Sequence, residues 1–345
     1  MSSLALSVLD LVPVRTGQTT GQALEAARRL ARVADEAGAR RYWVAEHHNT
    51  HSVASTSPPV IIAMLAAATE RIRVGSGGVM LPNHAPLAVA EQFALLEAAH
   101  PGRIDLGIGR APGTDPVTSW ALRAGLSDED AVRRFPDYVQ QVAAYMDPGG
   151  ARIQIGPREH DVRATPLAAQ APPVWLLGSS DYSARLAGQL GLPYVFAHHF
   201  AGRGTAEALD LYRTSWLGEG PPQTFLTVNA VVADSREEAE RLALPFQHMM
   251  ARLAAGALME PTPLMTVEEA EEARLLLPPE RFAAITRPWL LGTAEEVAEG
   301  MRSLAREHDV TEVMVQPIAG SYASEPLEAT PARERTVREL AEALQ

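Results

Sequence analysis

Short apolar segments alternate with longer amphipathic segments along the chain, and this alternation limits the possible folds more than any other feature. Eight segments are short and rich in strand-forming residues: 4–10, 41–46, 72–80, 103–109, 174–178, 193–197, 225–233 and 312–318. Eight longer segments have helical periodicity: 21–37, 57–69, 86–99, 127–146, 180–190, 204–217, 235–256 and 293–307. Near-continuous apolar strands that alternate with helices predict a parallel sheet that is covered on both faces.

The number of strand–helix pairs predicts an α/β protein with a closed (β/α)8 TIM barrel. Such barrels take about 250 residues or more, and a chain of 345 residues leaves room for insertions. An open doubly wound sheet ranks second, because it usually has fewer strands and a glycine-rich turn after the first strand. We therefore expect a single domain over 1–345. Within it, 110–126 is a long loop, and 257–290 is an inserted, lid-like segment before the last βα unit.

Composition limits the chemistry and the partners. A net charge of −12 disfavours a nucleic-acid partner. The chain has no cysteine and no lysine, so any anion must be bound by arginine, hydroxyl groups or backbone amides. The longest apolar stretch, 60–69, is far shorter than the roughly 20 residues that span a bilayer. The N-terminal segment lacks the basic start of a secretion signal, so we expect a cytoplasmic protein without a membrane partner.

The first group of candidate catalytic residues follows the second predicted strand. In a (β/α)8 barrel the active site lies at the carboxyl ends of the strands, and this strand ends in Glu46, His47 and His48. Successive strand residues point to opposite faces, so only one of these histidines can face the mouth of the barrel. A metal-dependent hydrolase is an alternative, in which a carboxylate and three histidines, His47, His51 and His198 or His199, bind the metal ion. The chain lacks the H-x-H spacing typical of such enzymes, so we expect no metal ion.

A second group of candidates could bind an anion. The fifth predicted strand ends in Gly178, Ser179 and Ser180, directly before a helix. Backbone amides and hydroxyl groups at a helix N-terminus bind anions, although the same residues are also common helix caps. Because lysine is absent, Arg110 at the end of the fourth strand is the expected partner of a phosphate, and an ordinary ion pair is the alternative.

These motifs together are similar to those of the bacterial luciferase-like flavin monooxygenase family, along almost the whole chain. The similarity is greater to uncharacterised single-chain members than to the light-emitting subunits. It is carried by ARRYWVAEHHN, RIRVGSGGVMLPNHAPLAVAEQFALLEAAHPGRIDLGIGRAPGTDP and PVWLLGSSDYSARLAGQLGLPYVFA. The resemblance implies a (β/α)8 barrel that binds reduced FMN, or in some branches the deazaflavin F420, at its mouth. It implies neither a substrate nor light emission.

The resemblance also implies a role for individual residues. His47 matches the catalytic base, and an imidazole can move a proton at neutral pH. We expect Glu46 or His48 to orient His47. Gly77 and Gly78 match a pair of small residues joined by a cis peptide bond under the flavin ring. Arg133 matches a second arginine that binds the phosphate, and Arg134 is the alternative for this role. The predicted cofactor-binding residues are Glu46, Gly77, Gly78, Arg110, Arg133, Gly178, Ser179, Ser180, Tyr182 and His198.

The expected function is a monooxygenase that takes reduced FMN from a separate flavin reductase and uses O2 to oxidise a small, aldehyde-like organic substrate. The chain contains no second, NAD-binding domain, which favours a two-component system. F420-dependent hydride transfer is the first alternative, although an acidic chain suits the acidic tail of F420 poorly. A non-catalytic flavin-binding protein is a further alternative. From the family we also expect a homodimer.

Overall fold

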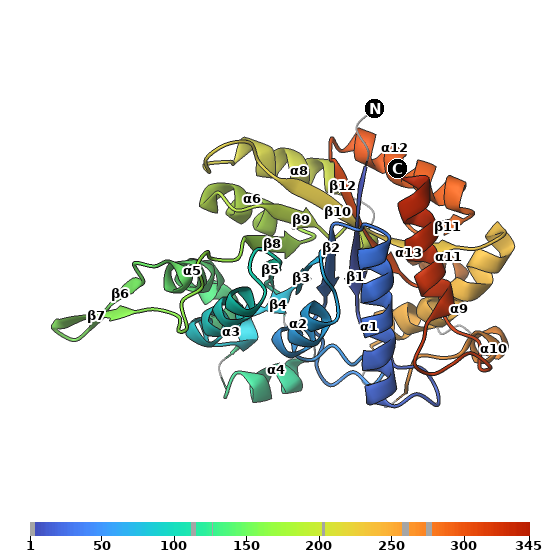
Figure 1. Ribbon diagram of the computed structural model, residues 1–345, viewed down its shortest axis with the longest axis horizontal. Helices are drawn as coiled ribbons and strands as arrows, with labels where there is room; N and C mark the ends of the chain where they lie inside the picture. Colours follow the sequence, from blue (N-terminus) through green and yellow to red (C-terminus); the bar gives the residue numbers. More distant parts are fainter. Residues whose placement is uncertain (1–3, 112–114, 126, 202–203, 257–261, 274–277) are drawn as a thin grey trace.

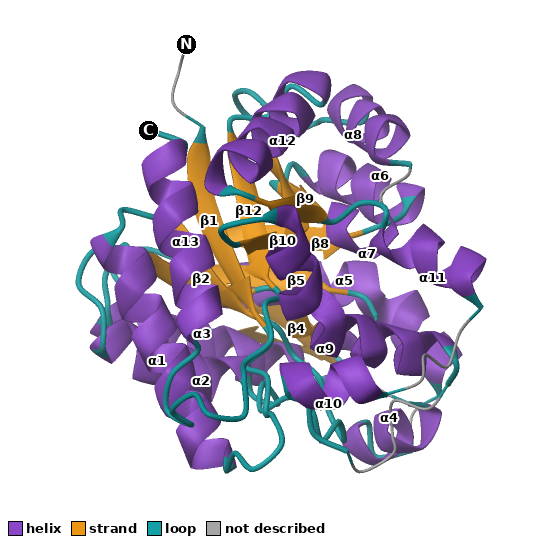
Figure 2. Ribbon diagram, turned by 90° about the vertical axis from the view of Figure 1, so that its right-hand side faces the viewer, coloured by secondary structure: helices purple, strands orange, loops and turns teal. Residues whose placement is uncertain are grey.

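The computed structural model describes residues 4–111, 115–125, 127–201, 204–256, 262–273 and 278–345, and the predicted barrel is confirmed within them. Parallel strands pair in a closed ring, which lies at the centre of the molecule (Figure 2). The ring consists of β1 (Ala5–Asp10), β2 (Arg41–Val44), β3 (Arg73–Ser76), β5 (Ile104–Gly109), β8 (Val174–Gly178), β9 (Tyr194–Phe196), β10 (Thr224–Val232) and β12 (Glu312–Pro317), which pairs again with β1.

Helices surround the strands, because each helix buries one apolar face against the outside of the barrel (Figure 1). The first begins with a capping box in which Thr19 and Gln22 satisfy each other's backbone N–H groups, and it buries Leu30 fully. The helices that cover the barrel are α1 (Thr20–Glu36), α2 (Pro58–Ala67), α3 (Pro86–Ala99), α5 (Asp128–Met146), α6 (Asp181–Leu190), α8 (Thr205–Thr214), α9 (Arg236–Ala254), α12 (Ala294–Glu307) and α13 (Pro331–Ala343). None of the described helices is long and apolar enough to cross a membrane.

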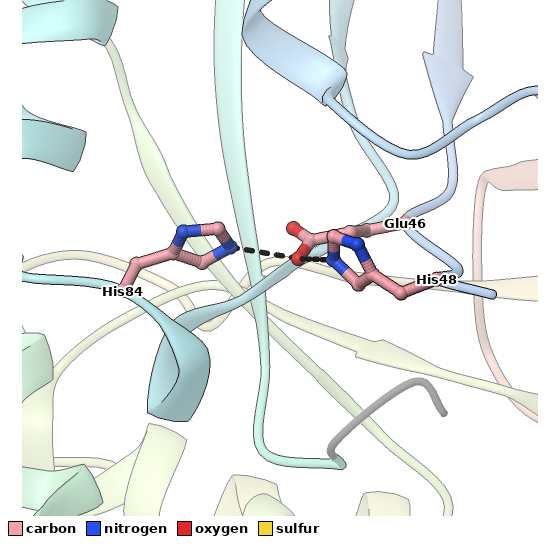
Figure 3. A group of neighbouring side chains, drawn as sticks. All are labelled: Glu46, His48 and His84. Carbon is pink, nitrogen blue, oxygen red and sulfur yellow. Dashed lines mark hydrogen bonds and ion pairs between the residues drawn. The ribbon is translucent and has the colours of Figure 1, made fainter. Parts of the chain in front are cut away.

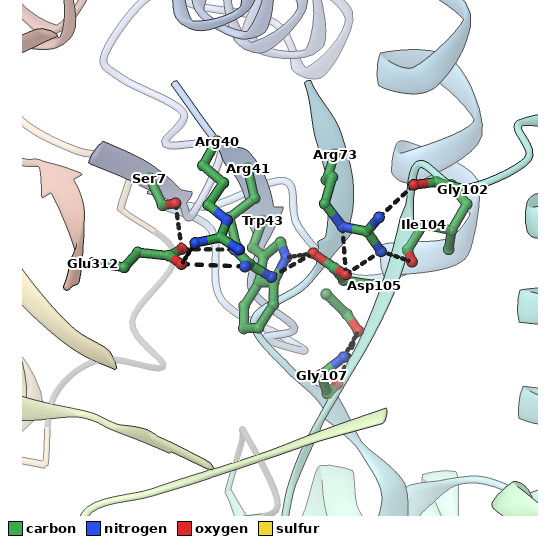
Figure 4. Close-up of polar contacts among 11 residues, drawn as sticks. Ser7, Arg40, Arg41, Trp43, Arg73, Gly102, Ile104, Asp105, Gly107 and Glu312 are labelled. Carbon is green, nitrogen blue, oxygen red and sulfur yellow. Dashed lines mark hydrogen bonds and ion pairs between the residues drawn. The ribbon is translucent and has the colours of Figure 1, made fainter. Parts of the chain in front are cut away.

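The interior of the barrel is layered, as expected when alternate strand residues point inward. Near the amino ends of the strands, Arg41 bridges the carboxylates of Asp105 and Glu312 (Figure 4). Above this polar floor lies a layer of apolar and aromatic side chains: Leu9, Trp43, Trp175, Val195, Phe225 and Met314. The two layers close the lower part of the barrel, so any ligand site must lie above them, at the carboxyl ends of the strands.

Several details differ from the sequence prediction. The predicted strand 72–80 is two strands, β3 and β4 (Val79–Met80), which meet around a cis peptide bond between Gly77 and Gly78. The helix predicted at 293–307 precedes the eighth strand of the ring. The helix that follows this strand is α13, which the sequence analysis missed because its segment, PARERTVRELAEA, is mostly polar and its buried apolar face is narrow.

Three additions to the barrel lie between its βα units. The predicted loop 110–126 contains the short helix α4 (Pro116–Leu122). An antiparallel hairpin, β6 (Ala151–Ile155) with β7 (Arg158–Val162), precedes β8 and projects from the barrel (Figure 1). The predicted lid, 257–290, includes α10 (Val267–Glu272) and α11 (Pro279–Thr286) and is followed by β11 (Leu290–Gly292); 257–261 and 274–277 lie outside the described residues. Leu264 pairs with the chain after β1, so the start of this segment is bonded to the barrel, and its role as a lid stays a prediction.

Candidate active site

His47 lies at the mouth of the barrel, directly after β2. Its backbone N–H donates to Ser55 O at 2.9 Å, which ties this strand end to the following loop. The Nδ1 atom of its ring is buried and has no hydrogen-bond partner among the described residues. Burial lowers the pKa of His47 to about 4, although the negative charge of Glu46 partly opposes this effect. The ring is therefore neutral at pH 7 and can accept a proton.

Glu46, the residue before His47, is fully buried. Its Oε1 atom accepts hydrogen bonds from Nε2 of His48 and Nε2 of His84, both at 2.7 Å, and its Oε2 atom accepts from Met80 N at 3.0 Å (Figure 3). Burial favours the protonated acid, but these hydrogen bonds outweigh it and lower the pKa of Glu46 to about 2. The carboxylate thus joins the end of β2 to the segment after β4. No hydrogen bond between Glu46 and His47 is among these interactions, so the expected orientation of His47 by Glu46 is not seen as a direct bond, and the contact of Glu46 with a cofactor stays a prediction.

The group of Glu46, His48 and His84 also has the composition of a metal site. Their donor atoms lie within 4.8 Å of one another, and a carboxylate with two imidazoles suits zinc and similar ions. Both Nε2–Oε1 distances are 2.7 Å, however, which is a hydrogen-bond distance. Two ligands on one tetrahedral ion with bonds of about 2.0–2.1 Å lie about 3.3 Å apart. The geometry fits hydrogen bonding better than coordination, and the expectation of a metal-free site stays a prediction.

Gly77 and Gly78 lie where strands of the barrel approach one another closely. Their peptide bond is cis, as the family resemblance implied. A Cβ atom on Gly78 would lie 2.9 Å from Gly107 O, and one on Gly77 would lie 2.7 Å from a methyl carbon of Leu9. Neither position can hold a side chain without displacing its neighbour. Close packing against β1, β2 and β5 therefore requires glycine at both positions, and a contact of their backbone with a flavin ring stays a prediction.

Arg110 and the start of α6 form the predicted anion site. The guanidinium carbon of Arg110 lies 4.2 Å from the ring centroid of Tyr182, so two of the predicted residues stack on one another. Ser180 is the N-cap residue of α6, but within the described part of the chain its side chain makes no capping hydrogen bond. Ser179 precedes it and is exposed. Hydroxyl groups, N-terminal amides and one arginine therefore lie together, which is the combination that binds phosphate.

The remaining predicted cofactor residues lie in different surroundings. Gly178 ends β8, where a Cβ atom would lie 2.2 Å from Ser183 Oγ. Arg133 is exposed in the second turn of α5 and pairs with Asp130, so the choice between Arg133 and Arg134 stays open.

His198 is buried away from the mouth. Its Nδ1 atom lies 2.8 Å from Thr205 Oγ1, at the start of α8, and its ring centroid lies 6.0 Å from that of His308. These contacts do not bring His198 to the other predicted site residues.

The fold brings two further histidines into this region: His84, which sequence reasoning missed, and His199, which it considered only as a metal ligand of the hydrolase alternative. His199, and not His198, interacts electrostatically with His47 and bonds to Thr227 of β10. A signal for it existed, because Val195 faces the interior and a period of two residues selects 197 and 199. His84 follows the short 3-10 helix η1 (Leu81–Asn83), so no periodic pattern marked it.

The fold and the site geometry define a (β/α)8-barrel protein with a buried histidine after β2 and with Arg110 stacked on the first turn of α6, both at the carboxyl ends of barrel strands. The sequence model of the luciferase-like monooxygenases matches residues 4–311. The chain belongs to this luciferase-like monooxygenase family.

Curated relatives support this membership. A "Luciferase-like monooxygenase" of Escherichia coli strain K12 is 41% identical over 320 residues, which cover 91% of each chain. The N-acetyl-S-alkylcysteine monooxygenase of Bacillus subtilis is 32% identical over 325 residues, covering 90% of this chain and 92% of the relative. The crystal structure of apo-MsnO8 is 32% identical, with a TM-score of 0.81 over 99% of this chain and 98% of the other.

More distant structures share only the fold. The oxygenating constituent of a 3,6-diketocamphane monooxygenase of Pseudomonas putida, solved with FMN, is 18% identical with a TM-score of 0.73; it aligns over 99% of this chain and 98% of its own. An F420-dependent secondary alcohol dehydrogenase, solved with an F420–acetone adduct, is 14% identical with a TM-score of 0.69 and the same coverage. The barrel is thus one that holds flavin in one protein and deazaflavin in another.

Proposed function

We propose that the protein is an FMN-dependent monooxygenase that receives reduced FMN from a separate reductase and uses O2 to oxidise a small organic substrate. The observation that carries this proposal is the combination of Arg110, stacked on the first turn of α6, with a buried histidine that has an unpaired ring nitrogen, both at the carboxyl ends of barrel strands. The names of relatives that oxidise organic molecules, such as the N-acetyl-S-alkylcysteine monooxygenase, support this class of reaction.

The residues at the mouth fit a flavin mononucleotide. Ser179, Ser180 and Arg110 would hold its phosphate, and the backbone at Gly77 and Gly78 would lie against its ring. Reduced flavin, when bound, supplies the electrons with which O2 is activated. The protein's own contribution is to hold the ring in one orientation and to keep water from it, which the closed apolar layer below the mouth favours.

His47 is the proton acceptor in this proposal. Its Nδ1 atom is buried, and no described residue bonds to it, so a ligand atom can take that position. Because burial lowers its pKa, the imidazole is neutral at pH 7, so one ring nitrogen carries a lone pair that can accept a proton. The position of its backbone is fixed by the bond to Ser55 O.

The charges near the anion site favour FMN over F420. The long acidic tail of F420 needs a groove with several cations, whereas the described contacts place one arginine, Arg110, at the start of α6, whose first turn also contains Asp181. The phosphate of FMN needs only one guanidinium and the amides at the start of α6.

The first test compares FMN with riboflavin, which has the same ring and no phosphate. We expect Arg110→Ala to weaken the binding of FMN about 10- to 150-fold, because hydrogen bonds to charged groups contribute about 1.5–3 kcal/mol. Riboflavin affinity should not change. Arg152→Ala is the matched control, since Arg152 is exposed on the β6–β7 hairpin.

The outcome is read from quenching of flavin fluorescence, followed by substrate oxidation with NADH and an added flavin reductase. Equal losses for FMN and riboflavin would show that Arg110 does not bind the phosphate. Tighter binding of F420 than of FMN would replace this function with the F420-dependent alternative. The reductase partner and a homodimer belong to the same proposal, and sedimentation velocity with and without reductase measures both.

A further inference from the structure

His199 is a second histidine at the mouth of the barrel, and the roles described so far do not use it. It lies in the short helix α7 (His198–Ala201), directly after β9. The two adjacent histidines point in different directions: His198 bonds to Thr205 on the outside, whereas Nδ1 of His199 bonds to Thr227 Oγ1 of β10. Thr227 is an inward-facing residue, because Phe225, two positions earlier, belongs to the aromatic layer of the interior.

Neighbouring residues hold His199 in one position. Asn229 Nδ2 donates a hydrogen bond to His199 O at 3.2 Å, so β10 binds both the backbone and the ring of this residue. Thr227 Oγ1 also lies 3.4 Å from Phe196 O, which can only accept a hydrogen bond. The hydroxyl group has one hydrogen, and when it donates this hydrogen to Phe196 O it must accept a hydrogen bond from Nδ1–H of His199.

The protonation of His199 then follows from its surroundings. Burial lowers its pKa to about 3, and positive charge on His198 or His47 would lower it further. The ring is therefore neutral at pH 7. A neutral ring that carries its hydrogen on Nδ1 has a lone pair on Nε2, so this atom accepts hydrogen bonds.

Unsatisfied polar atoms lie beside this histidine. Asn229 is 1% exposed, and its Oδ1 atom has no hydrogen-bond partner among the described residues; the same holds for His47 Nδ1. His47 follows β2 and His199 follows β9, so both lie at the carboxyl ends of barrel strands, on the same side of the barrel. Buried polar atoms in native proteins almost always have a hydrogen-bond partner. The unpaired Nδ1 of His47 and Oδ1 of Asn229 therefore indicate that a bound molecule supplies their partners.

We propose that His199 is a ligand-facing residue of the active site, whose Nε2 atom accepts a hydrogen bond from an N–H or O–H group of the bound molecule. Thr227 and Asn229 act as positioning residues for it. The inference rests on the proposed function. The donor is either the N–H edge of the reduced flavin ring or a hydroxyl or N–H group of the organic substrate, and the shared chemistry is hydrogen-bond donation to a neutral imidazole.

The test uses a substitution that separates the two ring nitrogens. His199→Asn keeps an amide near the position of Nδ1, which can still donate to Thr227, but it removes the acceptor at Nε2. His199→Gln places an amide oxygen near Nε2 instead. His198→Asn is the matched control, because it changes the adjacent histidine whose ring faces Thr205 and His308. Each full-length variant is titrated with oxidised FMN and, in the absence of oxygen, with reduced FMN. Its KM for the organic substrate that it oxidises is then measured.

If the flavin is the donor, His199→Asn weakens the binding of reduced FMN about 3- to 10-fold, because only the reduced ring has the extra N–H group. The affinity for oxidised FMN stays within about 2-fold of the wild-type value. If the substrate is the donor, both flavin affinities are unchanged and the KM rises by the same factor. In either case His199→Gln restores part of the loss, and His198→Asn has no effect.

A His199→Asn protein that folds normally and has wild-type flavin affinities and KM would overturn this inference while leaving the proposed function intact. If this variant does not fold, Thr227→Val replaces it: this variant keeps the imidazole and releases its anchor, so it must show the same losses, and wild-type values would refute the inference. A wild-type protein that binds neither form of FMN refutes the proposed function and this inference with it.

Discussion

Replacing Arg41 with methionine should lower the free energy of unfolding, because it removes the buried ion pairs at the amino ends of the barrel strands. The side chain is 3% exposed and bonds to Asp105 Oδ2 at 2.9 Å and to Glu312 Oε1 at 2.7 Å, while its guanidinium lies 4.7 Å from the Trp175 ring centroid. Removing one partner of a buried ion pair costs about 3–5 kcal/mol, because the other charge stays buried. Asp105 keeps Arg73 at 2.6 Å, so we expect about 3 kcal/mol, the lower end of this range.

Urea unfolding, followed by tryptophan fluorescence, measures this loss, since Trp43 and Trp175 lie beside Arg41. Arg28→Met is the control: Arg28 is half-exposed and pairs with Glu25 on α1, so its loss should stay below about 1 kcal/mol. Adding Glu312→Leu to Arg41→Met should recover part of the stability, because apolar residues can replace a buried ion pair. If the free energy of unfolding of Arg41→Met lies within about 1 kcal/mol of the wild-type value, the stability of the barrel does not depend on these ion pairs.

Two further predictions concern the strand ends and the histidines. Gly107→Ala places a Cβ atom 2.0 Å from Ser76 O, so β3 and β5 must separate; we expect a loss of about 3 kcal/mol in urea unfolding, and a wild-type midpoint would contradict it. Gly21→Ala, with no atom near its added Cβ, is the control. The pKa values of His47 and His199, lowered to about 4 and about 3, mean that the unfolded chain binds protons first as the pH falls. The stability that these two neutral rings contribute should be complete above about pH 6.5 and should fall progressively below it. Between pH 7 and pH 5 the thermal midpoint of the wild type should therefore drop more than that of a His47→Asn, His199→Asn double variant. Equal drops would refute the lowered pKa values of these two histidines.

The sequence alone predicted the fold class because strand and helix periods are local properties. A strand such as VWLLG and a helix with Leu30 on its buried face are recognisable without knowledge of their partners. The same holds for GSS before α6 and for Arg110 at a strand end, which the barrel rule places at one mouth. The narrow apolar face of α13 shows where this reasoning fails, since its helix is stabilised mainly by the barrel against which it packs.

The tertiary structure decided which of the candidate side chains meet. Sequence reasoning allowed only one of His47 and His48 to face the mouth, but it could not show that His48 turns to a carboxylate shared with His84, nearly forty positions further along the chain. It also chose His198 as the cofactor-binding residue, although the two-residue period from Val195 favours His199; only the structure shows that His199, in α7, is the one that bonds to β10. Period and composition depend on neighbours in sequence, whereas hydrogen-bond partners, burial and pKa depend on residues that only the closed barrel brings together.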